Sequence, residues 1–314
     1  MFYWLKRVYE PEFYHGPARP KEYFEGWYFK VVAADHAFAV IPGVSWAPSD
    51  PHSFVQTIDG KTGRATYERL DIRDFVYDRR RFEFRVGESE FSLERMRVQT
   101  DTLKAELEFS EIVRWPSSLL SPGTMGWYSF VPFMECKHGI LAMDGLVTGT
   151  VNGDDGVSGR VYVEKDYGRS FPQGWIWGQS NNFREEGVSI SCSVAKVPFL
   201  GGAFTGFLIG FLLNGRLFRF TTYTGARLAH LDADSDQARI VVRDRENELK
   251  LSCHRAHGSE LAAPAAGEML GRIEESLASR IDVEFSQRGT VTFRGSGLSA
   301  GLEVVHPDVL ESPR

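Results

Sequence analysis

The sequence of 314 residues has few cysteines and no excess of basic residues. Its three cysteines, Cys136, Cys192 and Cys253, lie far apart and form no C-x-x-C pair. This spacing argues against a disulfide framework or a structural zinc site and fits a reducing compartment. The 36 Lys and Arg residues against 42 Asp and Glu residues give a formal net charge of −6. We therefore expect no nucleic-acid partner, because such proteins need a basic surface.

The common cofactor motifs are also missing. No Walker A motif, Rossmann fingerprint, H-E-x-x-H helix or G-x-S-x-G elbow occurs, and the eight histidines do not cluster. We therefore expect no cofactor and no bound metal. The first seven residues lack the apolar stretch and cleavage site of a secretory signal, so we expect a cytoplasmic protein.

Aromatic residues are abundant at 13%, and there are 31 glycines, a composition typical of β-structure with tight turns. Apolar residues alternate with period two along most of the chain, which predicts strands. The expected strands are 22–32, 37–44, 53–58, 66–76, 81–86, 90–98, 103–109, 140–150, 159–166, 174–183, 188–197, 206–213, 216–224, 239–243, 248–256, 280–287 and 290–305. Turn signals such as Asn152-Gly153 and Asn214-Gly215 separate them.

The strands form two successive sets of about eight, which favours an all-β protein with two antiparallel β-barrels or one large double sheet. We place the domains at residues 1–170 and 171–314. One short helix is expected near 264–279, where Pro264 suits a first helical turn. Four apolar residues there follow helical spacing: Met269, Leu270, Ile273 and Leu277.

The uncharged run from Val197 to Gly215 is about long enough to cross a bilayer. Pro198 and five glycines make it a poor helix, and Gly201-Gly202 is a turn signal. We favour two buried strands joined at this turn and expect no transmembrane span. Peripheral contact with a membrane surface is a further possibility.

Polar residues interrupt the aromatic strands in three segments, around Glu25, Glu135 and Glu164. Tyr162, Glu164 and Asp166 share one strand face by alternation. A second mixed face is expected on the strand that carries Trp175, Trp177, Gln179 and Asn181.

The chemistry of these faces suits acid catalysis on an apolar substrate. A carboxyl group held among tryptophans would lose its solvation, which raises its pKa and lets it donate a proton. Tryptophan faces attract cations, and amides orient hydroxyl or carbonyl groups.

Structural explanations stand beside this one. Glu164, Lys165 and Asp166 could form an outward charge patch or ion pairs with Arg160 or Arg169, and the tryptophans could be core residues. Lys165 could also pair with a neighbouring carboxylate, which would lower the pKa of that group and weaken it as an acid.

Several motifs together resemble the tocopherol cyclase family. They are Glu25-Gly-Trp-Tyr-Phe-Lys30, Glu164-Lys-Asp-Tyr-Gly168, Phe171-Pro172 and Trp175-Ile-Trp177-x-Gln-Ser-Asn181-x-Phe183. The resemblance spans about residues 21–305. It implies two lipocalin-like β domains and an isomerase that closes a prenylated hydroquinone to a chromanol without a redox cofactor.

Under the cyclase hypothesis, particular residues are expected to do this chemistry. The expected proton donors are Glu164 and Asp166, followed by Glu25 and Glu135. The expected substrate-binding residues are Trp27, His138, Tyr162, Lys165, Trp175, Trp177, Gln179 and Asn181. The expected partner is a lipophilic small molecule.

The chain departs from the plant enzymes at Asp166-Tyr167, where those have Asn and Trp, and at the triplet Cys136-Lys137-His138. With no import leader expected, the chain looks bacterial and its substrate stays open. Two alternatives therefore remain beside the cyclase. One is a noncatalytic lipocalin-like binder of a hydrophobic molecule, and the other is a hydratase of a polyene or prenyl alkene, the resembling group being related to carotenoid hydratases.

Overall fold

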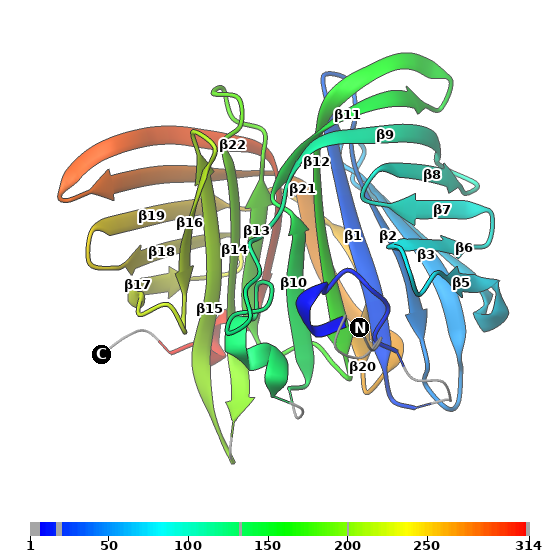
Figure 1. Ribbon diagram of the computed structural model, residues 1–314, viewed down its shortest axis with the longest axis horizontal. Helices are drawn as coiled ribbons and strands as arrows, with labels where there is room; N and C mark the ends of the chain where they lie inside the picture. The colour runs from blue at the N-terminus through cyan, green and yellow to red at the C-terminus, as the bar shows by residue number, and fades with distance from the viewer. Residues whose placement is uncertain (1–6, 17–20, 132–133, 200, 312–314) are drawn as a thin grey trace. The chain divides into compact units, whose positions relative to one another are not determined.

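The computed structural model describes residues 7–16, 21–131, 134–199 and 201–311. Its regular structure is almost entirely β, with the short 3-10 helices η1 (Ile72–Asp74), η2 (Gly126–Phe130) and η3 (Pro307–Val309) (Figure 1). The all-β prediction is confirmed. The chain divides into two compact units: unit 1 is the chain up to Phe171 together with Leu261–Arg272, and unit 2 is Pro172–Glu260 together with the chain from Ile273. Most of the segment examined for a leader, residues 1–6, lies outside the described residues.

The sheet of unit 1 is a meander that nearly closes on itself. Its strands are β1 (Phe24–Ala33), β2 (Ala37–Ser45), β3 (His52–Asp59), β4 (Arg64–Asp71), β5 (Phe75–Tyr77), β6 (Glu83–Val86), β7 (Ser89–Ser92), β8 (Arg95–Gln99), β9 (Lys104–Val113), β10 (Cys136–Ala142), β11 (Asp144–Val151) and β12 (Asp154–Gly168). Over the described residues the order is β4-β3-β2-β1-β12-β11-β9-β8-β7-β6-β5, with β10 paired to β12. The first strand thus pairs with the last, as in up-and-down barrels, and η1 links the two ends of the order.

The sheet of unit 2 repeats this topology. Its strands are β13 (Trp175–Ser180), β14 (Ser189–Phe199), β15 (Gly202–Leu213), β16 (Arg216–Thr221), β17 (Arg227–Ala233), β18 (Gln237–Arg243), β19 (Asn247–His254), β20 (Ser259–Ala265), β21 (Glu268–Gln287) and β22 (Thr290–Val305). In the described part of the chain the order is β16-β15-β14-β13-β22-β21-β19-β18-β17, with β20 paired to β21. Again the first strand, β13, pairs with the last, β22.

Each meander encloses its own hydrophobic core because alternate side chains point inward. In β1 these are Trp27, Phe29 and Val31. In β15, which lies within the apolar run 197–215, Phe207, Ile209 and Phe211 fill the core of unit 2.

The apolar run is therefore the hairpin β14–β15, as predicted, although Leu200 at its turn lies outside the described residues. Among the helices described, none is long and apolar enough to cross a membrane. The predicted turns are also present. Asn152-Gly153 and Asn214-Gly215 both have positive φ, the conformation of the tight turns that join antiparallel strands.

The helix predicted near 264–279 is wrong, because this segment forms the hairpin β20–β21. Ala266 and Gly267 both have positive φ at its turn. Along β21, Ile273, Glu275, Leu277 and Ser279 are buried and the residues between are mostly exposed, which is period two. The buried Glu275 and Ser279 interrupt the apolar alternation, and the remaining apolar residues happen to match helical spacing. Leu270, assigned to the helical stripe, is 70% exposed.

Candidate functional site

Strands β1 and β12 carry many of the residues predicted to form the site and divide them between two faces. Their register places Trp27 opposite Lys165. Both side chains lie on the face of the unit 1 core, and Glu25, two residues before Trp27, shares that face. Glu164 and Asp166 lie on the opposite face of β12. The predicted residues of unit 1 therefore form two separate groups.

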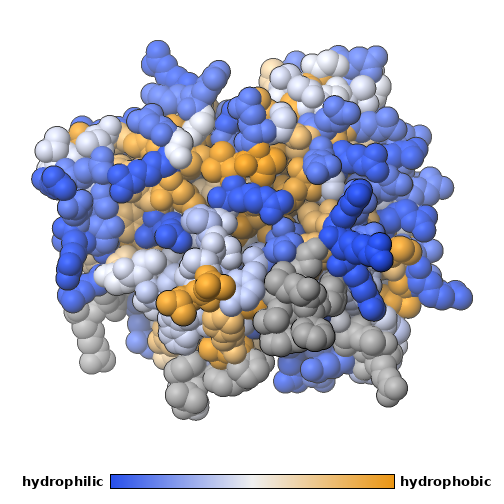
Figure 2. Space-filling model, in the orientation of Figure 1, coloured by the Kyte–Doolittle hydropathy of each residue, from blue (hydrophilic) through white to orange (hydrophobic). Residues whose placement is uncertain are grey.

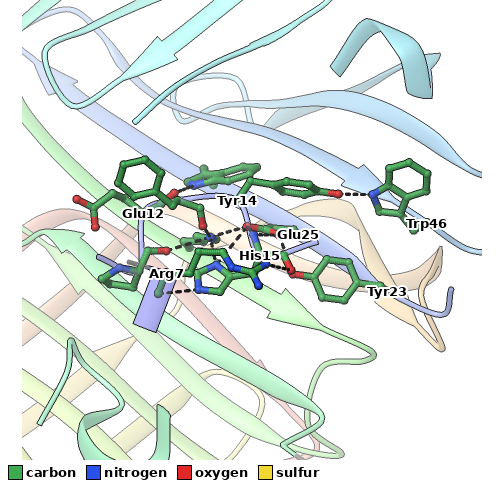
Figure 3. A network of polar contacts seen from close by, with 11 residues as sticks. Arg7, Glu12, Tyr14, His15, Tyr23, Glu25 and Trp46 are labelled. Atoms are coloured by element: carbon green, nitrogen blue, oxygen red, sulfur yellow. Dashed lines mark hydrogen bonds and ion pairs between the residues drawn. The ribbon is translucent and has the colours of Figure 1, made fainter. Parts of the chain in front are cut away.

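The group on the core face is a buried ion pair of Lys165 and Glu25. Figure 3 labels Glu25 together with its neighbours His15 and Tyr23. Lys165 Nζ lies 2.5 Å from Glu25 Oε1, and both side chains are fully buried. The Tyr23 hydroxyl donates to Glu25 Oε2 at 2.6 Å, and the His15 backbone N–H lies 2.9 Å from each carboxylate oxygen. Lys165 Nζ also donates to the Phe13 carbonyl at 2.5 Å and lies 2.8 Å from His15 Nδ1. Both charges are thus compensated by groups of the protein.

The charges of this group follow from burial and from each other. Burial raises the pKa of Glu25, but the charge of Lys165 and the hydrogen bonds outweigh it, so the pKa of Glu25 falls below its ordinary value. Burial lowers the pKa of Lys165 to about 8, and the charge of Glu25 opposes this fall. Burial, with the charge of Lys165, lowers the pKa of His15 to about 4. At neutral pH, Glu25 is therefore a carboxylate and does not supply a proton.

An N-terminal segment, residues 7–15, covers this pair. Trp27 Nε1 donates to the Glu12 carbonyl at 2.9 Å, and Tyr14 joins the unit 1 core. The ammonium of Lys165 lies 4.9 Å from the centroid of the Trp27 ring. Trp27 is only 1% exposed, and its ring contacts the buried ammonium of Lys165.

The group on the opposite face joins β12 to β10. Their register places His138 opposite Asp166. His138 Nδ1 lies 3.1 Å from Asp166 Oδ1, and His138 Nε2 lies 3.7 Å from Glu164 Oε2. The Tyr162 hydroxyl donates to Glu164 Oε2 at 2.6 Å. We call His138, Tyr162, Glu164 and Asp166 the acid cluster.

The acid cluster has the parts for moving a proton. If His138 donates its Nδ1–H to Asp166, the ring is neutral and its lone pair lies on Nε2. Nε2 is the ring nitrogen that lies near Glu164. A carboxyl group and a basic nitrogen then lie close together. Glu164 is 4% exposed, so a proton on this carboxyl is shielded from solvent.

The acid cluster also has potential metal ligands. His138, Glu164 and Asp166 each offer one ligand atom, and these atoms all lie within 4.8 Å of one another. Nitrogen and carboxylate oxygen donors of this kind suit divalent transition metals. The sequence led us to expect these residues in one site but no bound metal there.

Glu135, the fourth predicted acid, lies just before β10 and is exposed. Its backbone carbonyl accepts hydrogen bonds from the N–H groups of Arg169 and Ser170. Exposure leaves its carboxyl group solvated, without the desolvation on which the argument for an acid depends.

The predicted residues of unit 2 lie together on β13 and just after it. Ile176 joins the unit 2 core, so Trp175, Trp177 and Gln179 lie on the other face of the strand. Trp175 Nε1 donates to Glu303 Oε2 on β22 at 2.6 Å. Gln179 and Asn181 are buried. Both units thus carry polar and aromatic residues on the strand face opposite their core.

Sequence reasoning missed residues of both groups in unit 1. Tyr23 and Tyr167 belong to segments singled out as aromatic strands, and the alternation could have placed them beside Glu25 and Lys165. Lys30 is 1% exposed and lies opposite Tyr162, a position the same alternation predicts. His15 lies in a segment without periodic pattern and gave no signal.

Comparison with known proteins identifies relatives. The family model described as "Tocopherol cyclase-like" matches residues 84–305. The chloroplastic tocopherol cyclase of Zea mays is 32% identical over 110 residues, and a probable tocopherol cyclase of Oryza sativa subsp. japonica is 30% identical over 110 residues. Each match covers 32% of this chain but only 23% of the plant protein.

Two solved structures have the same fold over nearly the whole chain. The structure of CghA with Sch210972 has a TM-score of 0.56 at 10% identity, covering 92% of this chain and 89% of that one. Kievitone hydratase from Nectria haematococca has a TM-score of 0.51 at 14% identity, covering 93% of this chain and 92% of that one. At these identities the similarity concerns the fold alone.

Proposed function

Since this chain belongs to the tocopherol cyclase-like family, we propose that it is an enzyme that protonates an alkene of a lipophilic substrate and lets an oxygen nucleophile capture the cation. The reaction we favour is ring closure of a prenylated hydroquinone to a chromanol-type product. The observation that carries the proposal is the acid cluster on β10 and β12, where a buried carboxyl lies 3.7 Å from a histidine nitrogen. Family membership supports the class of reaction, and the substrate is the finer part of the proposal.

In this mechanism Glu164 is the acid. Its protonated carboxyl gives a proton to the less substituted carbon of a trisubstituted alkene, and the tertiary cation forms next to it. The Tyr162 hydroxyl, 2.6 Å from Glu164 Oε2, stabilises the carboxylate that remains.

His138 then acts as the base. The phenol oxygen of the hydroquinone bonds to the cation and loses its proton to His138 Nε2, while Asp166 holds the other ring nitrogen. Transfer of this proton from His138 to Glu164 restores the starting state. One proton enters at carbon and one leaves from oxygen, so the product is an isomer of the substrate.

A hydratase is the second candidate, because water can take the place of the phenol at the same cluster. His138 would accept a proton from water as readily as from a phenol. Kievitone hydratase, with the same fold, supports this alternative. Its product would be heavier than the substrate by one water.

The proposal includes a lipophilic small-molecule partner and peripheral contact with a membrane surface. Figure 2 shows apolar residues at the surface of the face it draws. Between β9 and β10, Leu119 is 78% and Leu120 is 85% exposed, and Trp127 and Phe130 are about half exposed. Exposed apolar residues gathered in one segment favour contact with a lipid surface or an apolar ligand.

The test is incubation with a panel of prenylated hydroquinones in heavy water with EDTA present, read by mass spectrometry. We expect an isomer that carries one deuterium on carbon after exchangeable deuterium is washed out. Glu164→Gln should lower the rate by about 100-fold or more, the range for loss of a general acid. Glu83→Gln, an exposed position in β6, is the matched control and should keep the full rate.

Other outcomes separate the alternatives. A product heavier by one water identifies the hydratase. Tight binding of a hydroquinone without turnover favours the noncatalytic lipid-binding protein. Full activity of Glu164→Gln would show that the acid is assigned to the wrong residue.

A further inference from the structure

We propose that unit 1 has a second ligand site, a pocket for a small organic anion on the core-face side of β10 and β12. The pocket has a volume of about 300 Å3 and is lined by Arg7, Val8, His15, Tyr23, Ser129, Lys137 and Tyr167. This volume is at the lower end of the range for small-molecule sites. The proposal stands whether or not the chain is a cyclase.

The pocket lies on the other side of the strands from the acid cluster. Lys137 is opposite Tyr167 in the β10–β12 register, and the next pair along is His138 opposite Asp166. Because side chains alternate between faces, Lys137 and Tyr167 point away from the face of His138. A ligand in this pocket is therefore not the substrate of the acid cluster.

The charge of the lining is positive. Arg7 and Lys137 are cationic side chains, and none of the described residues that line the pocket is a carboxylate. The nearby carboxylate of Glu25 is already paired with Lys165 at 2.5 Å. Lys137 Nζ donates to the Ser129 carbonyl at 2.8 Å, an acceptor that does not neutralise its charge.

Burial supports the same conclusion. Lys137 is only partly exposed, so its ammonium has lost part of its hydration, and the Ser129 carbonyl that it contacts is neutral. An anion in the pocket would supply the missing negative charge. Charge-assisted hydrogen bonds from lysine and arginine to carboxylates are among the stronger polar contacts in proteins.

The aromatic lining selects an organic anion. The His15 ring stacks on Tyr167 with centroids 4.1 Å apart and an interplanar angle of 16°. Burial lowers the pKa of His15 to about 4, and a phenol ordinarily titrates near pH 10, so both rings are neutral at neutral pH. Among the described residues no group accepts a hydrogen bond from the Tyr167 hydroxyl, which leaves this donor for a ligand. Flat neutral rings beside two cations suit an aromatic carboxylate.

The experiment is calorimetric titration of the intact protein with benzoate and with benzamide, its neutral isostere. We expect benzoate to bind with a dissociation constant below about 1 mM. Benzamide should bind at least about tenfold more weakly, because one charge-assisted hydrogen bond is lost. Raising the salt concentration should weaken benzoate binding, because the attraction is electrostatic.

Lys137→Gln should weaken benzoate binding by about tenfold or more. Lys104→Gln, at an exposed position in β9, is the matched control and should bind as the unmodified protein does. The circular dichroism spectrum checks that Lys137→Gln is folded.

Equal binding of benzoate and benzamide to the unmodified protein would overturn the proposal, as would no benzoate binding at all. Both results are measured on the unmodified protein, so they do not depend on whether a variant folds. A folded Lys137→Gln with undiminished affinity for benzoate would also overturn it.

Discussion

Single residues decide how charge is distributed in unit 1, and Glu25 and Lys165 are the clearest case. Glu25→Gln removes the carboxylate and leaves the buried ammonium of Lys165 without a counter-charge. Breaking a buried ion pair from one side costs about 3–5 kcal/mol. We expect a loss of this size in the free energy of unfolding, measured by urea denaturation.

The double variant Glu25→Leu/Lys165→Met should regain part of this loss, because no buried charge remains. Glu83→Gln in β6 should change the unfolding free energy by less than about 0.5 kcal/mol. A similarly small effect of Glu25→Gln would contradict the assignment of a charged pair.

His15 makes the stability of the protein depend on pH in a narrow window. Its pKa of about 4 in the folded chain lies below the ordinary 6.5, because burial and Lys165 disfavour the charged ring. The unfolded chain then binds more protons between these values, so stability is full above pH 6.5 and falls as the pH drops toward 4. The gap corresponds to about 3 kcal/mol.

We expect His15→Gln to flatten this part of the curve, since glutamine does not titrate. The measurement is unfolding free energy at steps between pH 7 and pH 4 for both proteins. Glu25, whose ordinary pKa is 4.5, contributes in the same direction only as the pH approaches and passes below that value. His52, whose pKa burial also lowers, leaves a smaller slope in the variant, so a slope between pH 6.5 and 5 that is undiminished in His15→Gln would refute the role of His15.

At the residue scale, the sequence predicted which side chains lie together better than which partners they contact. Glu164, Asp166, Tyr162 and His138 were all named and lie together. Lys165 pairs with Glu25, an alternative that the sequence left open. Which carboxylate the lysine meets depends on strand register, and residue types alone do not fix register.

At the element scale, period-two alternation predicted many strands to within a few residues. It joined β4 to β5, β7 to β8 and β10 to β11, and it missed β17 and β20. The segment expected at 22–32 is β1 (Phe24–Ala33), because its inward residues are uniformly apolar or aromatic apart from Glu25. The prediction failed on the first half of β21, where Glu275 and Ser279 occupy buried positions, while the strand predicted at 280–287 forms its second half. Polar residues at inward positions interrupt the alternation of apolar and polar residues from which strands are predicted.

The N-terminal segment shows a second limit at this scale. It is held mainly through backbone groups, with the Glu12 carbonyl accepting from Trp27 and the Phe13 carbonyl from Lys165. Every residue has a carbonyl, so no residue type marks these contacts in the sequence. The sequence therefore offers no basis for predicting that this segment covers the buried pair.

For the whole molecule, the number of strands was enough to predict two β units, since each set of strands can enclose one core. The order of strands follows the same pattern in the described part of both units, with the first strand paired to the last. The compact units, however, are not simple halves of the chain, because Leu261–Arg272 belongs with unit 1. Neither composition nor turn signals indicate that this segment belongs with unit 1.

The cysteines allow the core of unit 2 to be followed separately. Cys192 and Cys253 are buried in that core, and burial raises the pKa of each thiol. Cys136 lies in unit 1, on β10. In a Cys136→Ser variant, thiol labelling therefore reports on unit 2 alone. We expect no labelling of the native variant over minutes, because a buried neutral thiol is unreactive.

In rising urea, the two thiols should become reactive together, since both belong to one core. Their common midpoint is the unfolding midpoint of unit 2, and circular dichroism of the same samples reports on the whole chain. Cys192→Ala and Cys253→Ala, each added to Cys136→Ser, check the thiols singly. Rapid labelling of either thiol without urea would mean that the core of unit 2 is open to solvent, contrary to its 1% exposure at both positions.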